Sequence, residues 1–227
     1  MILPTSYGSH TRHSPALYSK GGEGFGIRIS RDPTALTVSI SKRKNQVLAC
    51  YLMPAREILD LLKGGGDRRS IGRSDQVAAM VSKNLQLFPK LMVGLWSKDP
   101  LVRMRAADAA EKVTRRNPEL LTPYRKELLG LLSETIEQEL RWHLAVMVPR
   151  LALNSKERKR AISSLNSYMQ DKSSIVKAFA LQGLADLARD DRRITSTVIA
   201  ILREATRSGT PAMKARSRKL LHGLERV

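Results

Sequence analysis

The sequence is poor in the residues that build covalent and metal-centred sites. Its single cysteine, Cys50, cannot close an internal disulfide, and no second thiol is present to complete a thiolate zinc site. No metal-binding spacing connects the four histidines, which are His10, His13, His143 and His222. The sequence also lacks a G-x-S-x-G nucleophile motif and a Walker phosphate loop. We therefore expect neither a cofactor nor a metal, and no small-molecule substrate is indicated.

Aromatic residues and long apolar runs are also scarce. Aromatic side chains make up 4% of the chain, whereas hydrophobic residues make up 42%. An aliphatic composition of this kind, rich in Ala and Leu, is typical of helices that pack on helices. No apolar run approaches the roughly 18 residues that span a bilayer, so we predict an all-α protein without membrane segments.

Acidic residues are outnumbered by basic ones. The chain has 40 Lys and Arg against 21 Asp and Glu, a formal net charge of +19. A surplus of this size favours polyanions or acidic proteins as partners, although it says nothing about the fold. The single cysteine indicates a reducing compartment, and no signal-peptide pattern begins the sequence, so a cytoplasmic location is expected.

The first part of the chain differs in composition from the rest. Residues 1–52 contain seven Ser, five Gly and three Pro, with seven basic residues against two acidic ones, and no segment keeps a helical period. We predict a disordered basic tail there, or a segment upstream of a true start at Met53. Residues 53–85 are predicted to form a helical cap, with amphipathic helices at 55–63 and 74–84 and Ser74 capping the second.

From residue 86 onward the sequence repeats. Leucines recur every 37 residues, at Leu91, Leu128, Leu165 and Leu202. A second apolar column, with a basic residue directly after each member, recurs at intervals of 36 to 38 residues. The basic column consists of Arg103, Arg141, Lys177 and Lys214. Small residues follow about one turn later, at Ala106, Ala145, Ala180 and Ser217. Each repeat is predicted to be a pair of antiparallel helices that stacks on the next pair.

The clearest repeat, "FPKLMVGLWSKDPLVRMRAADAAEKV" at 88–113, resembles the HEAT repeat of the HEAT and armadillo class. Pro89 and Pro123 match the proline often found in the first helix of that repeat. The resemblance implies a right-handed α-solenoid of about four HEAT-like helical hairpins over 86–227, behind the N-terminal helical cap. The family also tends to place an Asp six residues before the basic residue, where it can form a ladder with Arg between repeats. Only Asp171 and Lys177 keep that spacing, so a continuous ladder is not expected.

The second helix of each hairpin is expected to supply the binding surface, because second helices commonly line the concave face of a solenoid. Positions two, five and nine residues after the basic column are predicted to point outward. The resulting strip mixes charges of both signs with an exposed aromatic residue, which suits a protein partner better than a duplex. The candidate partner-binding residues are Arg105, Asp108, Lys112, His143, Arg150, Phe179, Gln182, Arg216 and Lys219.

Two basic clusters keep nucleic acid open as an alternative partner. One lies among glycines before the second cap helix and consists of Arg68, Arg69 and Arg73. The other lies in the last repeat and consists of Lys214, Arg216, Arg218 and Lys219. The second cluster is also consistent with a polar capping repeat that keeps the end of a solenoid soluble.

A third alternative is a DNA glycosylase of the alkylpurine type. Those enzymes resemble HEAT solenoids, are basic, and use a cleft lined by Trp together with a catalytic acid. The present chain offers only Trp96 and Trp142 for such a cleft. A non-catalytic scaffold that binds a protein partner is therefore the leading hypothesis, with nucleic-acid binding second and the glycosylase third.

Overall fold

The computed structural model describes residues 55–66, 70–189 and 191–225, all of which belong to one structural unit, Ser41–Val227. Every regular element in these residues is helical and none of them forms a strand, which confirms the prediction of an all-α chain. The predicted tail, 1–52, lies outside the described residues, as do Arg68 and Arg69.

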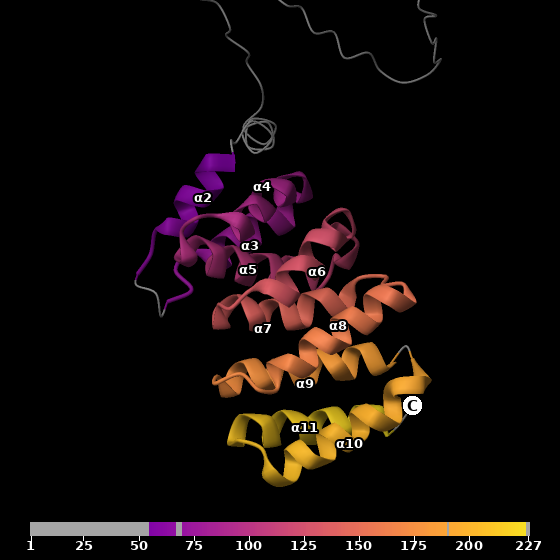
Figure 1. Cartoon of the computed structure of the whole chain (residues 1–227). Helices are drawn as coiled ribbons and strands as arrows, with labels where there is room; N and C mark the ends of the chain where they lie inside the picture. Colours follow the sequence, from indigo (N-terminus) through magenta and orange to yellow (C-terminus); the bar gives the residue numbers. More distant parts are fainter. Residues whose placement is uncertain (1–54, 67–69, 190, 226–227) are drawn as a thin grey trace, which may run out of the picture. The chain divides into compact units, whose positions relative to one another are not determined.

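The described helices follow one another with short connections (Figure 1). The α-helices are α2 (Ala55–Lys63), α3 (Ser74–Lys83), α4 (Phe88–Met92), α5 (Pro100–Thr114), α6 (Arg125–Glu134), α7 (Gln138–Met147), α8 (Ser155–Tyr168), α9 (Ser174–Arg189), α10 (Arg192–Ser208) and α11 (Pro211–Leu224). Short 3-10 helices stand between some of them: η1 (Leu85–Leu87), η2 (Val93–Trp96), η3 (Pro118–Tyr124) and η4 (Val148–Arg150).

The two helices expected in the cap lie where the pattern placed them. α2 covers the predicted 55–63, and α3 ends one residue before the predicted 84. The prediction that Ser74 caps α3 is wrong, because Arg73 occupies the N-cap position without a side-chain hydrogen bond. Ser74 is buried instead, and its hydroxyl donates to Asp108 of α5. A buried hydroxyl needs a partner, and α5 supplies one.

The remaining helices pair along the chain as hairpins. α4 with η2 packs on α5, α6 on α7, α8 on α9, and α10 on α11. The starts of several helices are set by local capping: Asp99 caps α5 ahead of Pro100, Asn154 forms a capping box at α8, and Thr210 caps α11. These caps end the turns that separate one helix from the next.

The second helix of each pair packs on the second helix of the next pair. α3 contacts α5, α5 contacts α7, α7 contacts α9, and α9 contacts α11. Figure 1 shows α9 between α7 and α11. The repeat columns supply the contact surfaces: the leucine column, Leu91, Leu128, Leu165 and Leu202, and the small column, Ala106, Ala145, Ala180 and Ser217, are both fully buried. The periodic residues therefore form the core.

The backbones of α7 and α9 approach closely at Gly183. A Cβ atom added to Gly183 would lie 2.2 Å from the backbone oxygen of Ala145 and 3.1 Å from Cδ1 of Leu165. Ala145 belongs to the small column of α7, so the close approach occurs where the repeat pattern predicts small side chains. Gly183 is needed here for the space that it leaves.

Ion pairs link neighbouring repeats, and the spacing rule had indicated only one of the acids involved, Asp171. Arg103 of α5 donates to Glu137 in the turn before α7, and Arg141 of α7 donates to Asp171 in the turn before α9. Each arginine also donates to a backbone carbonyl of its own turn. Glu137 lies four residues before Arg141, outside the family spacing, and its longer side chain still reaches Arg103. The turn before α11 contains no acidic residue, so no further rung extends from Lys177.

We predict that Gly183→Ala destabilises the fold by about 1–3 kcal/mol, because the new methyl group overlaps a backbone atom of α7. Gly130→Ala in α6 is the matched control. Its Cβ would meet only the end of Glu134, at 3.9 Å, and the change should stabilise the protein by about 0.5–1 kcal/mol. Urea unfolding followed by circular dichroism measures both effects. Equal unfolding midpoints for the two variants would contradict the close contact between α7 and α9.

Candidate binding groove

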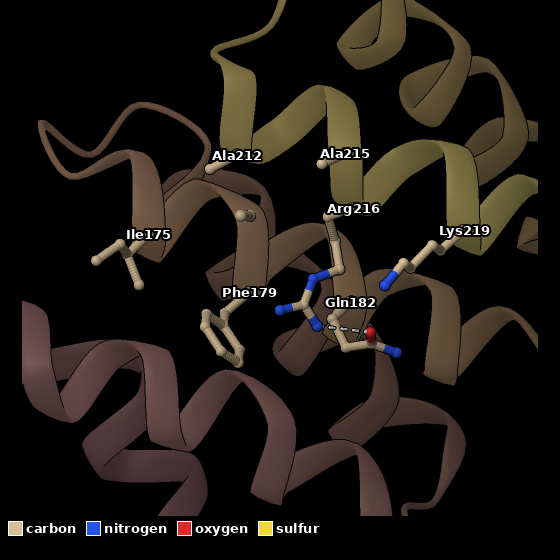
Figure 2. A pocket seen from close by; sticks show the side chains of 8 residues that line it. Ile175, Phe179, Gln182, Ala212, Ala215, Arg216 and Lys219 are labelled. Atoms are coloured by element: carbon tan, nitrogen blue, oxygen red, sulfur yellow. Dashed lines mark hydrogen bonds between the residues drawn. The ribbon is translucent and has the colours of Figure 1, made fainter.

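A groove of about 460 Å³ lies between α9 and α11. Figure 2 shows Arg216 reaching from α11 toward Phe179 and Gln182 of α9, with Lys219 one turn further along. These four residues are among those predicted to bind a partner, and the structure brings them together. The complete lining consists of Ile175, Ala178, Phe179, Gln182, Ala212, Ala215, Arg216 and Lys219.

The lining residues form pairs that are related by the repeat interval. Each residue on α9 has a counterpart on α11 that lies 37 positions later in the sequence. The pairs are Ile175 with Ala212, Ala178 with Ala215, Phe179 with Arg216, and Gln182 with Lys219. The groove is thus a seam between equivalent faces of two neighbouring second helices, and it can be compared with the same seam elsewhere.

The corresponding seam between α5 and α7 is almost filled. Its cavity measures about 30 Å³ and is lined in part by Leu101, Met104 and Glu139. Met104 and Trp142 hold the repeat positions that Ala178 and Ala215 hold in the last two repeats. Small side chains at this one column therefore open the seam between α9 and α11. The change from large side chains to alanine along this column is visible in the sequence, and it could have been used to locate the groove.

Arg216 is held in place on the wall of the groove. Its guanidinium carbon lies 4.6 Å from the centre of the Phe179 ring, a cation–π contact. Its Nη1 atom donates to Oε1 of Gln182 at 3.1 Å, and the amide nitrogen of Gln182 donates to Asp186 at 2.9 Å. Asp186 also pairs with Arg189 at 3.2 Å. This chain of contacts fixes the guanidinium and leaves most of its five N–H donors for other acceptors.

The groove has a positive electrostatic environment. α11 carries Lys214, Arg216, Arg218 and Lys219 and contains no acidic residue. Arg218 and Lys219 are exposed, while Lys214 is half-buried. Asp186 is the nearby carboxylate on α9, and its burial raises its pKa above the ordinary value, against the lowering effect of Gln182 and three arginines. The cations of α11 therefore have no acid on their own helix to neutralise them.

Arg105 was predicted to face a partner, and this prediction is wrong. The side chain is fully buried against the end of α2 and the glycine loop that follows. Its guanidinium donates to the backbone oxygens of Leu62 at 2.8 Å, Gly64 at 2.9 Å and Gly66 at 2.9 Å. The last carbonyls of a helix lack intrahelical partners, and Arg105 binds those of Leu62 and Lys63 at the end of α2.

Asp108 and Lys112 are also engaged within the protein. Asp108 is buried and accepts hydrogen bonds from Ser74 and Lys112. Lys112, which is half-buried, also pairs with Asp75 of α3. Burial alone would lower the pKa of Lys112, but its hydrogen bonds with Asp108 and Asp75 raise it. These residues join α3 to α5, so their predicted role on an outward surface is wrong for Asp108 and is not supported for Lys112.

His143 and Arg150 are also engaged within the protein. His143 is buried, not outward-facing as predicted, and packs edge-on against Trp142 with ring centres 5.7 Å apart. Arg150 pairs with the buried Glu111, and its Nη1 also donates to Thr114 at 2.9 Å. The side chain of Arg150 folds back onto α5 because the buried carboxylate of Glu111 needs cationic partners.

The glycine-loop cluster contributes little to the described surface. Of its members, Arg73 is exposed at the start of α3, and the other two lie outside the described residues. Gly65, Gly66 and Gly72 have positive φ angles, and a Cβ on Gly72 would lie 2.5 Å from the Arg105 guanidinium carbon. The glycines thus allow the loop to wrap around Arg105.

The groove lacks the features of a glycosylase cleft. Neither Trp96 nor Trp142 lines it. Trp96 is exposed at the end of η2, and Trp142 packs beside His143 on α7. Among the described residues, no group of three or more His, Cys, Asp or Glu side chains could hold a metal ion, and no helix is long and apolar enough to cross a membrane.

Comparisons of the chain with protein-family models, with curated proteins and with solved structures found no match. The binding chemistry of the groove must therefore be inferred from its own residues. Those residues offer an apolar end at Ile175 and Ala212 and a basic end at Arg216 and Lys219.

The buried His143 makes stability depend on pH. Burial lowers the pKa of His143 from 6.5 to about 4, although Asp108 and Glu111 oppose the shift. Because the unfolded chain takes up a proton that the folded chain does not, the contribution of His143 is fully present above about pH 6.5 and is lost as the pH falls toward 4. We predict that His143→Gln reduces the loss of unfolding free energy over this range by about 1–3 kcal/mol.

Urea unfolding at a series of pH values measures this dependence. His222→Gln is the matched control, since it removes an exposed histidine of α11 by the same substitution. A His143→Gln variant with the same pH dependence as the unaltered protein would contradict the assignment of a neutral, buried imidazole.

Proposed function

We propose that the protein is a non-catalytic scaffold that binds a partner protein along the ridge of its second helices, at the groove between α9 and α11. The observation that carries this proposal is the open seam with an apolar floor and a fixed arginine on its wall. Protein interfaces are enriched in aromatic residues and Arg, and they combine apolar pockets with a polar rim.

We further propose that the described helices form a right-handed α-solenoid of the HEAT-like kind. Three features support this architecture: the pairing of helices into hairpins, the packing of second helices on one another, and the ion pairs Arg103–Glu137 and Arg141–Asp171 between repeats. A cytoplasmic location fits the single cysteine, Cys50, which favours a reducing compartment.

Nucleic-acid binding is the second candidate, and the run of cations on α11 favours it. Neutralisation of phosphates would make such binding fall steeply with salt. Two observations favour a protein instead. The floor of the groove is apolar at Ile175, Ala178 and Phe179, and Arg216 already occupies one face of the Phe179 ring, where a base would otherwise stack.

The proposal predicts that filling the groove abolishes partner binding. Ala215→Trp installs on α11 the side chain that α7 carries at the equivalent position, Trp142, and Ala215 is exposed, so the fold should tolerate it. We expect immobilised full-length protein to retain specific proteins from a nuclease-treated native lysate, and Ala215→Trp to reduce their recovery about tenfold, equivalent to about 1.4 kcal/mol of binding free energy.

Ala200→Trp is the matched control, because Ala200 is exposed on α10 and does not line the groove. It should retain the same proteins as the unaltered chain, as quantified by mass spectrometry. Retention of no protein above a blank matrix would overturn the scaffold proposal. Equal retention by Ala215→Trp would leave a protein-binding scaffold but would remove the groove as its binding site.

A further inference from the structure

We infer that the groove between α9 and α11 receives a short acidic segment of the partner, anchored by one aliphatic or aromatic side chain and by a carboxylate close to it. This inference rests on the proposed function, because it names the chemistry of the partner at the same site. The apolar end of the groove indicates the aliphatic or aromatic side chain, and the basic end indicates the carboxylate.

The apolar end of the groove lacks a side chain to fill it. Ile175 lines the groove near the start of α9 and is 45% exposed. Opposite it, Ala212 and Ala215 are too small to cover it, and the repeat-equivalent seam between α5 and α7 holds larger side chains. An aliphatic or aromatic side chain from a partner would bury Ile175 and remove its apolar surface from water.

The basic end of the groove is prepared for a carboxylate. Arg216 is held by the ring of Phe179 and by Gln182, so little side-chain entropy remains to be lost when it binds an anion. Its planar guanidinium can donate two parallel hydrogen bonds to a carboxylate. Lys219, one turn later and exposed, adds a second positive charge.

The charge around the groove selects an acidic ligand over the other occupants. The cations of α11 are not balanced by acids on that helix, and a second groove of about 370 Å³, formed mainly by α10 with the C-terminal ends of α9 and α11, is lined by Arg189 and Arg192. Residues 1–52 of the chain itself carry seven basic residues against two acidic ones, and a second copy carries a net charge of +19. Both would be repelled by the basic end, whereas an acidic segment would be attracted.

The length of the groove limits the motif. Ile175 and Gln182 are seven positions apart on α9, which corresponds to about 10 Å along the helix axis. An extended peptide covers this distance with about three residues, and a partner helix covers it with about two turns. The apolar and acidic residues of the motif should accordingly lie about two or three positions apart in an extended segment, or about one or two turns apart in a helix.

The test uses full-length protein and an array of synthetic peptides of about twelve residues, long enough to exceed the roughly 10 Å span of the groove. Each peptide carries one Leu, Ile or Phe and several Asp or Glu at varied spacing. A second array replaces every acid by its amide, and a duplex DNA of about 20 base pairs is a further probe. Fluorescence polarisation measures the affinity of each hit. We expect a subset of the acidic peptides to bind with micromolar Kd, and their amide versions to bind at least about tenfold more weakly.

Two charge-reversal variants of neighbouring residues on α11 distinguish binding in the groove from general electrostatic attraction by the positively charged protein. Lys219 lines the groove, whereas Arg218 is equally exposed and does not. We expect Lys219→Glu to weaken the acidic peptides about tenfold and Arg218→Glu to weaken them by less than about twofold. Ala215→Trp should abolish binding, and Ala200→Trp should leave it unchanged. Circular dichroism and the thermal midpoint identify any variant that does not fold, in which case the peptide arrays decide alone.

Several results would overturn the inference. They are the absence of binding by every acidic peptide, equal binding of the amide array, equal effects of Lys219→Glu and Arg218→Glu, or duplex DNA that binds more tightly than the peptides and displaces them. None of these results bears on whether the lysate proteins are retained and are lost on filling the groove. The failure of the acidic motif and the failure of the scaffold are therefore distinguishable.

Discussion

The fold depends on the close approach of neighbouring second helices at small residues. Every side chain of the small column is fully buried, and Gly183 brings the backbone of α9 against the backbone oxygen of Ala145. Helices that meet at small residues lie at the short end of the usual range of about 8–10 Å between axes. Once that spacing is fixed, the volume of the flanking side chains decides whether the seam between two helices is filled or open. Between α5 and α7, where Met104 is part of the lining, a cavity of only about 30 Å³ remains, whereas between α9 and α11, beside Ala178 and Ala215, the groove measures about 460 Å³.

The sequence was sufficient to predict the helical class and the core, because both follow from periodicity. Leu91 and Val102 are buried where the pattern placed them, and α2 has the predicted bounds. Residue spacing fixes the direction in which a side chain leaves its own helix. It does not encode which neighbouring element lies in that direction, and the predictions that failed depended on that neighbour.

Arg105 and Arg216 illustrate the difference, since they occupy the same repeat position. Arg105 meets the end of α2 and the glycine loop, where free backbone carbonyls bind it, and it is fully buried. Arg216 meets the ring of Phe179 and the amide of Gln182, which hold it but leave it accessible on the wall of the groove. Equivalent residues thus have a structural role at one end of the described repeats and a candidate binding role at the other.

Positively charged side chains also have different roles in different repeats. In the middle repeats some of the arginines are used internally: Arg150 pairs with Glu111, and Arg141 pairs with Asp171. Such pairs offset the cost of burying each carboxylate, and these two arginines are not available to a ligand. α11 has no acidic residue with which its cations could pair within the helix, and Lys219 stays exposed. An anionic ligand would therefore be recognised by the last repeat and not by the net charge of the chain, because that repeat combines unneutralised cations with the open seam.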